Sequence, residues 1–558
     1  MWRKLFNLAC VIVFMRRETK RNLFIAGTYG AALLLGLLLG QNYADNNRQS
    51  GTSTLLPLGL GHTGKVQRMI DLIAANYVDS VDVEALQDLA ISEIMEQLDP
   101  HSEYLYAQAA VRQHQALEGS FDGIGIEYYR LNDTLTVVGL IPGGPAEKAG
   151  ILVGDRLIAI NGDTIAGIHV SDRTIEEKMR GRKGTPLDIH IQRAGRTIAQ
   201  PLRVVRDRVE VSSIDAAYIV DSVTAYVKVK RFGANTASDF ETALKNLKNA
   251  GAKRLVLDLR ENKGGYFSAA TALASQFFAD KKLLVYTEGA HEDRTDYYSA
   301  ADGLFGKGAL AVLIDEQSAS ASEIVAGAVQ DLNRGIIVGR TSFGKGLVQE
   351  QFGFGDGSAL NLTVARYYTP LGRCIQKTYP TNRNVVKAPN ASPRADLELT
   401  DDTHRPAAGQ ADLTQFNEGG SSIEMSDRSV LSGGITPDVW VPFGSQDTST
   451  WYQRLRKAGI IEEYVYGRLA QSVPTYSADH FLAKYRLPDE VYADFVGYTQ
   501  ARGIPLPQDE SPAVQALVRT DIEALLGRFY FGSEVFFRVR NRSDEMLAVA
   551  LDALEKGS

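Results

Sequence analysis

The feature that most constrains the fold is a series of short apolar segments that alternates with helical patterns between residues 223 and 339. The segments that we expect to be strands are 223–229, 254–259, 309–314 and 336–338. The expected helices are 238–248, a segment that ends near residue 279, and a segment that begins at residue 321. Strands that alternate with helices in this way predict an α/β layer with a largely parallel sheet.

Three unusual segments follow these predicted strands. They are ENKGG at 261–265, SASASE at 318–323 and FGKG at 343–346. In parallel sheets the reactive groups gather in the loops beyond the carboxyl ends of the strands. A serine at the start of a helix lies near unpaired backbone N–H groups and the positive end of the helix dipole, which suits a nucleophile whose attack creates an oxyanion. A lysine between two glycines, at the end of a buried strand, is a candidate for a neutral amine. The pair predicts a Ser/Lys hydrolase.

The segments that carry Ser320 and Lys345 also have simpler interpretations. Ser320 and Glu323 form the S-x-x-E pattern of a capping box, which only satisfies N–H groups at a helix start. Lys345 taken alone would most often be a solvated surface charge. The stretch from Gly339 to Lys345 begins a Walker A motif, but Gly346 stands where that motif needs Ser or Thr. The next residues, 347–352, look like a strand where the motif needs a helix. A P-loop nucleotide-binding protein is therefore the weaker alternative.

A mostly-β module is expected at residues 119–206. Its short strands and glycine turns include GIGI at 123–126, PAEKAG at 145–150 and GDRLIAING at 154–162. The module resembles a PDZ domain, in which loop N–H groups bind the terminal carboxylate of a peptide that adds as a strand to a sheet edge. The candidate carboxylate-binding residues are Gly123, Ile124, Gly125 and Ile126. The alternative is that the two glycines only form a β-bulge.

The N-terminal region carries a candidate membrane anchor. Residues 22–44 include no charged side chain and exceed the roughly 20 residues that a bilayer-spanning helix needs. Four basic residues precede this segment and Asp45 follows it, so the positive-inside tendency leaves the N-terminus in the cytoplasm. We expect a single-pass protein of the cell inner membrane with its catalytic part in the periplasm or another extracytoplasmic space. A cleaved signal peptide is the alternative.

Composition excludes several classes of function. The net charge of −7 comes with no basic block outside the N-terminus, which argues against nucleic acid as the main partner. The two cysteines, Cys10 and Cys374, form no CxxC pattern. The eight histidines are scattered without an HxxxH or Cys/His cluster, so we expect no metal site and no cofactor.

The order of the motifs resembles that of the carboxyl-terminal processing (tail-specific) peptidases. The matching landmarks are LDPHSEYL at 98–105, the PDZ block, DLRENKGG at 258–265, SASASEIVAGAVQD at 318–331, GRTSFGKGLVQ at 339–349, RYYTPLGRCIQ at 366–376 and GITPDVWV at 434–441. Glu261 and Lys263 vary the Gly-Gly loop. The segment between Gln376 and Gly434 is longer than the short link that is usual in the family.

The resemblance implies a role for each candidate residue. Ser320 would be the nucleophile, Lys345 the general base, and Gln349 the residue that positions the lysine. Gly265 and Ala321 would supply the N–H groups of an oxyanion hole. Ser318 and Ser322 stay open as alternatives to Ser320, because spacing alone does not separate the three serines.

The function implied by this resemblance is that of a serine endopeptidase of the cell envelope that recognises and processes or degrades proteins from their C-termini. Its partners would be proteins or peptides with free C-termini, the membrane through one helix, and further copies of itself in a homo-oligomer. The alternative from another class is a PDZ adaptor whose active site has decayed.

The expected organisation has six parts. They are a basic segment and anchor (1–45), a linker (46–62), an N-terminal helical part of the protease region (63–118), the PDZ domain (119–206), a protease core of the crotonase-like α/β fold (207–445, with a polar insertion at 380–433) and a C-terminal helical region (446–558). The apolar residues Leu547, Val549, Leu551 and Leu554 of the last part are expected to serve packing.

Overall fold

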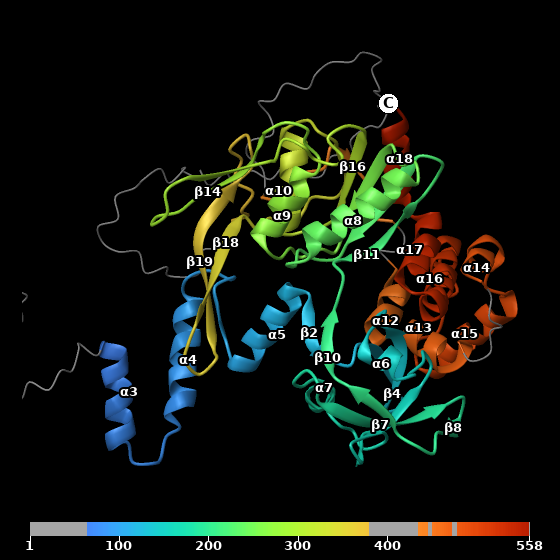
Figure 1. Cartoon of the computed structure of the whole chain (residues 1–558), viewed down its shortest axis with the longest axis horizontal. Helices are drawn as coiled ribbons and strands as arrows, with labels where there is room; N and C mark the ends of the chain where they lie inside the picture. The colour runs from blue at the N-terminus through green and yellow to red at the C-terminus, as the bar shows by residue number, and fades with distance from the viewer. Residues whose placement is uncertain (1–63, 379–432, 445–448, 471–476, 557–558) are drawn as a thin grey trace, which may run out of the picture. The chain divides into compact units, whose positions relative to one another are not determined.

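The computed structural model describes residues 64–378, 433–444, 449–470 and 477–556 (Figure 1). The predicted anchor and linker lie outside these residues, as does the predicted insertion apart from Gly433. Among the described residues, no helix combines the length and the apolar character needed to cross a membrane. The chain divides into two compact units, with the boundary between residues 87 and 88.

The helical pattern at residues 65–98 forms two helices, α3 (Lys65–Asn76) and α4 (Val83–Glu96). The helix α3 ends where Tyr77 adopts an extended conformation. The side chain of Asp82 accepts a hydrogen bond from the Ala85 N–H, which satisfies one of the free donors at the start of α4. The apolar face of α3 is open to solvent, with Met69 and Leu72 each more than half exposed.

The second unit is built on a six-stranded sheet with the order β11-β12-β13-β16-β17-β20. The strands are β11 (Ile214–Ile219), β12 (Thr224–Val229), β13 (Arg254–Asp258), β16 (Ala309–Ile314), β17 (Ile336–Gly339) and β20 (Val439–Trp440). Only β11 runs antiparallel to its neighbour within this sheet. The predicted α/β layer with a largely parallel sheet is confirmed.

Alternate residues of each strand point to opposite faces of this sheet, and both faces are covered. On one face, Leu255 and Leu257 pack among residues of α8 (Thr236–Asn249), α9 (Phe267–Ser275) and α10 (Ala321–Asp331). On the other face, Val256 packs with residues of α18 (Glu545–Lys556). Leu547 and Leu554 are buried in that second cluster, and Val549 and Leu551 pack against it. Their predicted packing role is confirmed.

A second sheet lies next to the predicted site. Its strands are β1 (Glu103–Leu105), β14 (Leu283–Glu288), β15 (Thr295–Tyr298), β18 (Leu347–Gly353) and β19 (Ala359–Tyr368). The strands β18 and β19 form an antiparallel hairpin around residues 354–358. This hairpin continues directly from the loop that carries Lys345.

The mostly-β module contains a seven-stranded antiparallel sheet in which β3 is an edge strand. The strands are β3 (Ile126–Leu131), β4 (Thr134–Leu140), β5 (Arg156–Ile160), β6 (Asp163–Thr164), β7 (Pro186–Arg193), β8 (Arg196–Thr197) and β9 (Leu202–Val205). The module also holds α6 (Pro145–Lys148) and α7 (Asp172–Met179). It follows α5 (Ala107–Glu118), and the paired strands β2 (Ser120–Gly123) and β10 (Asp207–Glu210) join it to the core.

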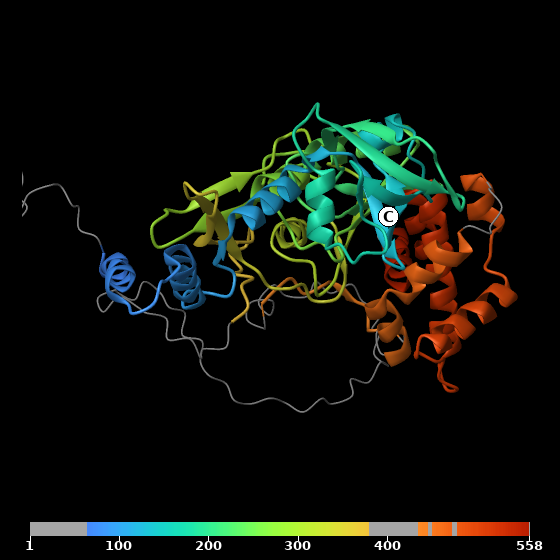
Figure 2. The ribbon, with the colours of Figure 1, turned by 90° about the horizontal axis from the view of Figure 1, so that it is seen from below.

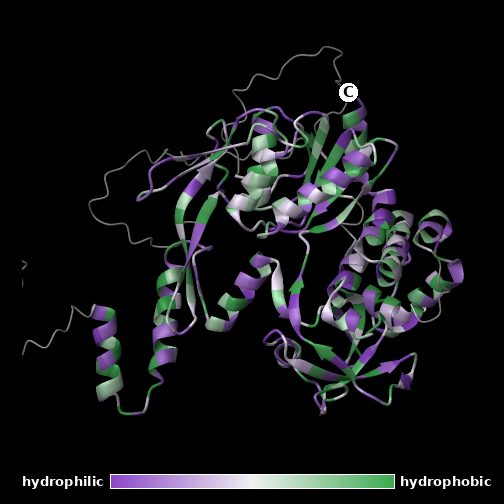
Figure 3. Ribbon diagram, viewed as in Figure 1, coloured by the Kyte–Doolittle hydropathy of each residue, from purple (hydrophilic) through white to green (hydrophobic). Residues whose placement is uncertain are grey.

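The C-terminal region is helical, as predicted. Its elements are α12 (Thr450–Ala458), α13 (Ile460–Tyr464), the π-helix η2 (Val465–Leu469), α14 (Ala478–Lys484), α15 (Asp489–Ala501), α16 (Pro512–Phe531), α17 (Ser533–Arg540), the short η3 (Asn541–Ser543) and α18. Most of these helices carry both hydrophobic and hydrophilic residues in Figure 3, as expected of helices that bury one face. They pack beside the mostly-β module (Figure 1, Figure 2), where Arg528 pairs with Glu127 of β3.

Candidate active site

Three loops meet at the carboxyl ends of three adjacent parallel strands. The loop after β13 carries Gly264 and Gly265, the turn after β16 carries Ser320, and the loop after β17 carries Lys345. Because β13, β16 and β17 are neighbours in the sheet, segments far apart in the sequence come together at one edge. The structure therefore brings the residues of the three predicted segments into one site.

Ser320 caps the N-terminus of α10 in an unusual backbone conformation. Its φ is 56° and its ψ is −114°, a region that residues other than glycine rarely adopt. Holding such a conformation costs on the order of 1–3 kcal/mol, and residues of this kind cluster at functional sites. The surrounding hydrogen bonds must therefore keep Ser320 in place against this strain.

The three serines of the SASASE segment have different surroundings. Ser318 and Ser322 are fully buried. The Ser318 hydroxyl donates to the carbonyl of Leu259, and that of Ser322 donates to the carbonyl of Asn262. Ser320 alone of the three is partly exposed. The geometry thus gives Ser318 and Ser322 structural partners and leaves Ser320 accessible.

The carboxylate of Glu323 connects the serine turn to the lysine loop. One of its oxygens, Oε2, accepts from the backbone N–H of Ser320 at 2.8 Å and from that of Lys345 at 2.9 Å. The other, Oε1, accepts from the N–H of Gly344 at 2.7 Å and from the hydroxyl of Ser342 at 2.5 Å. Burial raises the pKa of Glu323, and these four hydrogen bonds oppose the rise. The capping box is therefore real and also joins two parts of the site.

Lys345 is half-buried, and its ammonium group has a side-chain partner. Its Nζ donates to Oε1 of Gln349 at 2.6 Å. The Nε2 of Gln349 donates in turn to the carbonyl of His101, so the position of the amide is fixed from the other side. Burial lowers the pKa of Lys345, although the carboxylates of Glu103, Asp99 and Glu323 oppose this shift. A lysine with a lowered pKa is neutral at a lower pH and can then accept a proton.

The glycine loop packs tightly against the serine turn. A Cβ at Gly264 would lie 2.9 Å from the Cβ of Ser320 and 3.0 Å from the N atom of Ala321. A Cβ at Gly265 would lie 2.0 Å from the carbonyl oxygen of Phe232. Both glycines have positive φ, 96° and 146°. Only glycine fits these two positions, which explains why the chain has a Gly-Gly pair here.

The N–H groups of Gly265 and Ala321 have no acceptor among the hydrogen bonds of the described residues. The N–H groups on either side of Gly265 do have acceptors: that of Gly264 donates to the Asn262 side chain, and that of Tyr266 donates to the carbonyl of Phe232. Ala321 is the first residue of α10, where N–H groups have no partner within the helix. Two donors thus stay available near Ser320, at the positions where the resemblance to the peptidases implies an oxyanion hole.

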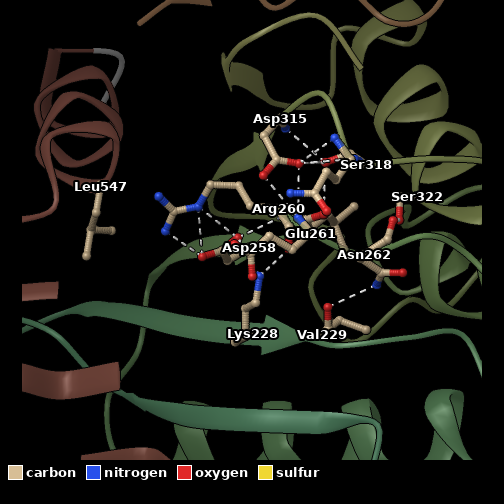
Figure 4. A network of polar contacts seen from close by, with 12 residues as sticks. Lys228, Val229, Asp258, Arg260, Glu261, Asn262, Asp315, Ser318, Ser322 and Leu547 are labelled. Atoms are coloured by element: carbon tan, nitrogen blue, oxygen red, sulfur yellow. Dashed lines mark hydrogen bonds and ion pairs between the residues drawn. The ribbon is translucent and has the colours of Figure 1, made fainter. Parts of the chain in front are cut away.

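An ionic cluster lies beneath the glycine loop (Figure 4). Asp258 is almost completely buried and pairs with Arg260 and Lys228. Burial alone would raise the pKa of Asp258, but these two cations hold it well below its usual range. Arg260 also pairs with Asp544, which precedes α18, at 2.8 Å. The loop that leads to Gly265 is therefore tied to the C-terminal helical region.

The predicted carboxylate loop lies at the start of the mostly-β module. Gly123 ends β2 and Ile126 begins β3, and Gly125 has a φ of 75°. The carbonyls of Ile124 and Gly125 accept from the N–H groups of Ala146 and Ile141. The side chain of Ile124 is buried in the core of the module. The irregular pairing of β3 with β4 falls later, between Glu127 and Tyr128.

The structure also bears on the nucleotide-binding alternative. The residues after Lys345 form the strand β18, so the helix of a P-loop is missing at this position. Within the described part of the chain, no group of three or more His, Cys, Asp or Glu side chains could hold a metal ion.

Sequence reasoning did not find several residues that organise this site. They are Asn262, Ser342, Tyr367 and Asp544. The hydroxyl of the buried Tyr367 donates to the carbonyl of Ser320 and also contacts that of Lys345. Each of these four residues also has a partner from a distant part of the chain, and no local pattern indicates that contact.

Comparison with known proteins gives three family matches along the chain. Residues 223–383 match peptidase family S41, residues 136–193 match the PDZ domain, and residues 451–532 match a family of unknown function. The first match contains Gly265, Ser320, Lys345 and Gln349.

Two curated relatives each match more than half of the chain. A carboxy-terminal-processing protease of Bartonella bacilliformis is 35% identical over 371 residues, which are 66% of this chain and 82% of the relative. The carboxy-terminal processing protease CtpB of Bacillus subtilis is 33% identical over 340 residues, which are 60% of this chain and 70% of the relative. Among solved structures, the photosystem II D1 C-terminal processing protease matches with a TM-score of 0.33 and 24% identity, covering 68% of this chain and 87% of that one.

Proposed function

The chain belongs to the carboxy-terminal processing proteases of peptidase family S41, and we propose that Ser320 and Lys345 are its catalytic dyad. The chain is thus a serine-type peptidase with a PDZ domain. The P-loop alternative lacks the helix that it needs after Lys345. The match to peptidase family S41 favours an enzyme over an inactive PDZ adaptor.

In this proposal each residue has a defined chemical task. Ser320 Oγ attacks the carbonyl carbon of the scissile bond while neutral Lys345 takes its proton. The N–H groups of Gly265 and Ala321 stabilise the oxyanion, and each such donor contributes about 3 kcal/mol in other serine proteases. The protonated Lys345 then gives its proton to the leaving amine, and water hydrolyses the acyl-enzyme. Gln349 holds the lysine through its 2.6 Å hydrogen bond.

The shared carboxylate of Glu323 is the observation that most strongly supports the dyad. Its Oε2 atom accepts hydrogen bonds from the backbone N–H groups of both Ser320 and Lys345. The hydroxyls of Ser318 and Ser322 instead donate to backbone carbonyls of the neighbouring loop. The test is a comparison of protein C-termini in cells that carry the wild type or Ser320→Ala. Processed C-termini that persist unchanged in the variant would contradict the proposal.

We further propose that the PDZ domain selects substrates by their free C-termini. Its edge strand β3 begins at Ile126 and can accept a peptide as an added strand. Ile126 and Tyr128 of this strand pack against the cluster that contains Ile175 and Met179 of α7. An extended peptide beside β3 would therefore meet an apolar surface that suits an apolar last side chain.

Location and assembly are also proposals. The uncharged segment at 22–44 and the basic residues before it support an inner-membrane anchor with an extracytoplasmic catalytic part. The exposed apolar face of α3 supports a homo-oligomer. Protease digestion of intact and opened spheroplasts, and light scattering of the purified protein, test the two statements separately.

A further inference from the structure

Asn262 has no direct part in the proposed chemistry, yet its buried side chain joins two segments of the site. Its Nδ2 donates to the carbonyl of Val229, the last residue of β12, at 2.9 Å (Figure 4). Its Oδ1 accepts from the N–H of Gly264 at 2.9 Å. The side chain is completely buried, so water cannot replace either hydrogen bond. It therefore fixes the glycine loop relative to the central sheet.

The backbone of the same residue holds the serine turn. The carbonyl of Asn262 accepts from the N–H of Ala319 at 3.0 Å and from the hydroxyl of Ser322 at 2.8 Å. Ala319 and Ser322 flank the pair Ser320–Ala321. One residue thus makes hydrogen bonds on both sides of the proposed oxyanion hole, next to Gly265 through its side chain and next to Ala321 through its carbonyl.

Close packing makes this arrangement sensitive to small shifts. A Cβ at Gly264 would already lie too close to Ser320 and Ala321, so the two segments are in direct backbone contact. The two N–H donors belong to different loops, and a hydrogen bond to an oxyanion requires a distance of about 2.7–3.1 Å from each. The separation between the donors must therefore be set by residues that contact both loops.

We propose that Asn262 is a positioning residue that sets the separation of the two oxyanion-hole donors. The inference rests on the proposed roles of Gly265 and Ala321. It assigns to the Asn262 side chain an effect on the transition state, beyond its contribution to folding.

The test compares Asn262→Ala and Asn262→Asp with the wild type. The alanine variant loses both side-chain hydrogen bonds. The aspartate variant keeps the shape and the acceptor for Gly264, but it turns an oxygen toward the carbonyl of Val229. Thr499→Ala is the control for the loss of a buried side-chain hydrogen bond, because Thr499 is completely buried and its hydroxyl donates to the carbonyl of Val496 within α15.

Three quantities are measured for the folded protein: kcat and KM on a peptide substrate, and the Ki of a peptide aldehyde of the same sequence. The Ser320 hydroxyl adds reversibly to such an aldehyde, and the resulting oxyanion occupies the same hole. We expect kcat to fall ~10–100-fold in both Asn262 variants, with KM within about twofold of wild type. The Ki should rise by the same factor as kcat falls. A purely structural role would lower the amount of active protein without changing this Ki.

Each other outcome counts against a specific statement. A wild-type kcat per folded molecule, or a lower kcat with an unchanged aldehyde Ki, overturns the inference about Asn262. So does the failure of both variants to fold, because the residue would then act on folding alone. An active Ser320→Ala enzyme would instead overturn the proposed function, which the Asn262 variants by themselves leave untouched.

Discussion

The backbone N–H groups of Ser320 and Lys345 donate to the same oxygen atom, Oε2 of Glu323, at 2.8 and 2.9 Å. A shared acceptor keeps the two backbones close whatever rotamers their side chains adopt. Because Glu323 belongs to the first turn of the fully buried helix α10, the whole arrangement is anchored in the core. The relative position of nucleophile and base is therefore a property of the fold as much as of the two side chains.

Glu323→Gln should disturb both loops at almost constant volume. In the wild type the backbone N–H groups of Ser320 and Lys345 share one carboxylate oxygen. An NH₂ group at that position would face these two N–H groups with its own hydrogens and could not accept a hydrogen bond from either. Leaving a buried donor unsatisfied costs about 1–3 kcal/mol, so thermal unfolding should shift to lower temperature. We also expect the two loops to shift. A shift that raises the activation barrier by ~1.4 kcal/mol would lower kcat ~10-fold. Calorimetry and kcat measure the two effects. Glu241→Gln, at an exposed ion pair with Lys245, is the control and should change neither.

The activity should depend on pH through Lys345. Burial lowers its pKa below the ordinary 10.5, and only the neutral amine can take the proton of Ser320. The rate should thus rise as pH increases through the lowered pKa and reach its plateau below pH 10.5. Lys345→Arg should be inactive at every pH, because arginine does not lose its proton in a protein. A pH–rate profile with no rise at any pH below 10.5 would contradict the proposed base.

The protonation of Lys345 should also affect the free energy of unfolding. With a folded pKa below the unfolded value of 10.5, the unfolded chain binds more protons between these two values. The free energy of unfolding should therefore decrease as the pH falls through that window, and level off below the folded pKa. Lys345→Met, of similar length and without a charge, should remove this slope in denaturant titrations at a series of pH values.

Ser320→Ala should abolish cleavage and cost only about 1 kcal/mol of stability, as expected for loss of a helix-capping serine. Ser318→Ala removes the hydrogen bond to Leu259 and Ser322→Ala the one to Asn262, so both should lower stability and keep measurable activity. Labelling with a fluorophosphonate followed by peptide mapping identifies the reactive serine. A label on Ser318 or Ser322 would show that the assignment of the nucleophile is wrong.

Local patterns in the sequence predict the strands of the core and the position of the site. The strand β16 is apolar throughout and is followed by small and polar residues, so its end and the helix start at Ser320 can be read directly. The Gly-Gly pair likewise indicates a place where only glycine fits. These features depend on residues close together in the chain, which is why sequence reasoning finds them.

The connections between the loops could not be predicted in the same way. Glu323 fits the pattern of a capping box, and this pattern accounts for only one of its four hydrogen bonds. The other three come from residues 342, 344 and 345, which reach it only when β16 and β17 pair. Asp544 meets Arg260 because α18 covers the sheet. Such contacts follow from the tertiary fold and leave no periodic signal in the sequence.

The PDZ domain should distinguish a peptide with a free C-terminus from its amide. Amidation removes the terminal charge and one oxygen acceptor, while hydrogen bonds to a charged group contribute about 1.5–3 kcal/mol. The amide should bind the Ser320→Ala protein at least ~10-fold more weakly, as measured by calorimetric titration. A scrambled peptide with a free carboxylate controls for charge alone. Equal affinities for the acid and the amide would mean that the domain does not recognise the terminus.

The ion pair of Arg260 with Asp544 should link the C-terminal helical region to the stability of the core. Both side chains are only 18% exposed, so solvent screens the pair weakly. Asp544→Asn keeps the hydrogen bond that caps α18, through the Leu547 N–H, because asparagine caps helices as well as aspartate does. It removes the charge next to Arg260, which should lower the free energy of unfolding by about 1–2 kcal/mol and lower the unfolding temperature. We also expect a lower kcat, because Arg260 leads into the glycine loop. Asp552→Asn at the exposed pair with Lys556 is the matched control. If Asp544→Asn unfolded at the wild-type temperature and kept the wild-type kcat, the ion pair would not support the glycine loop.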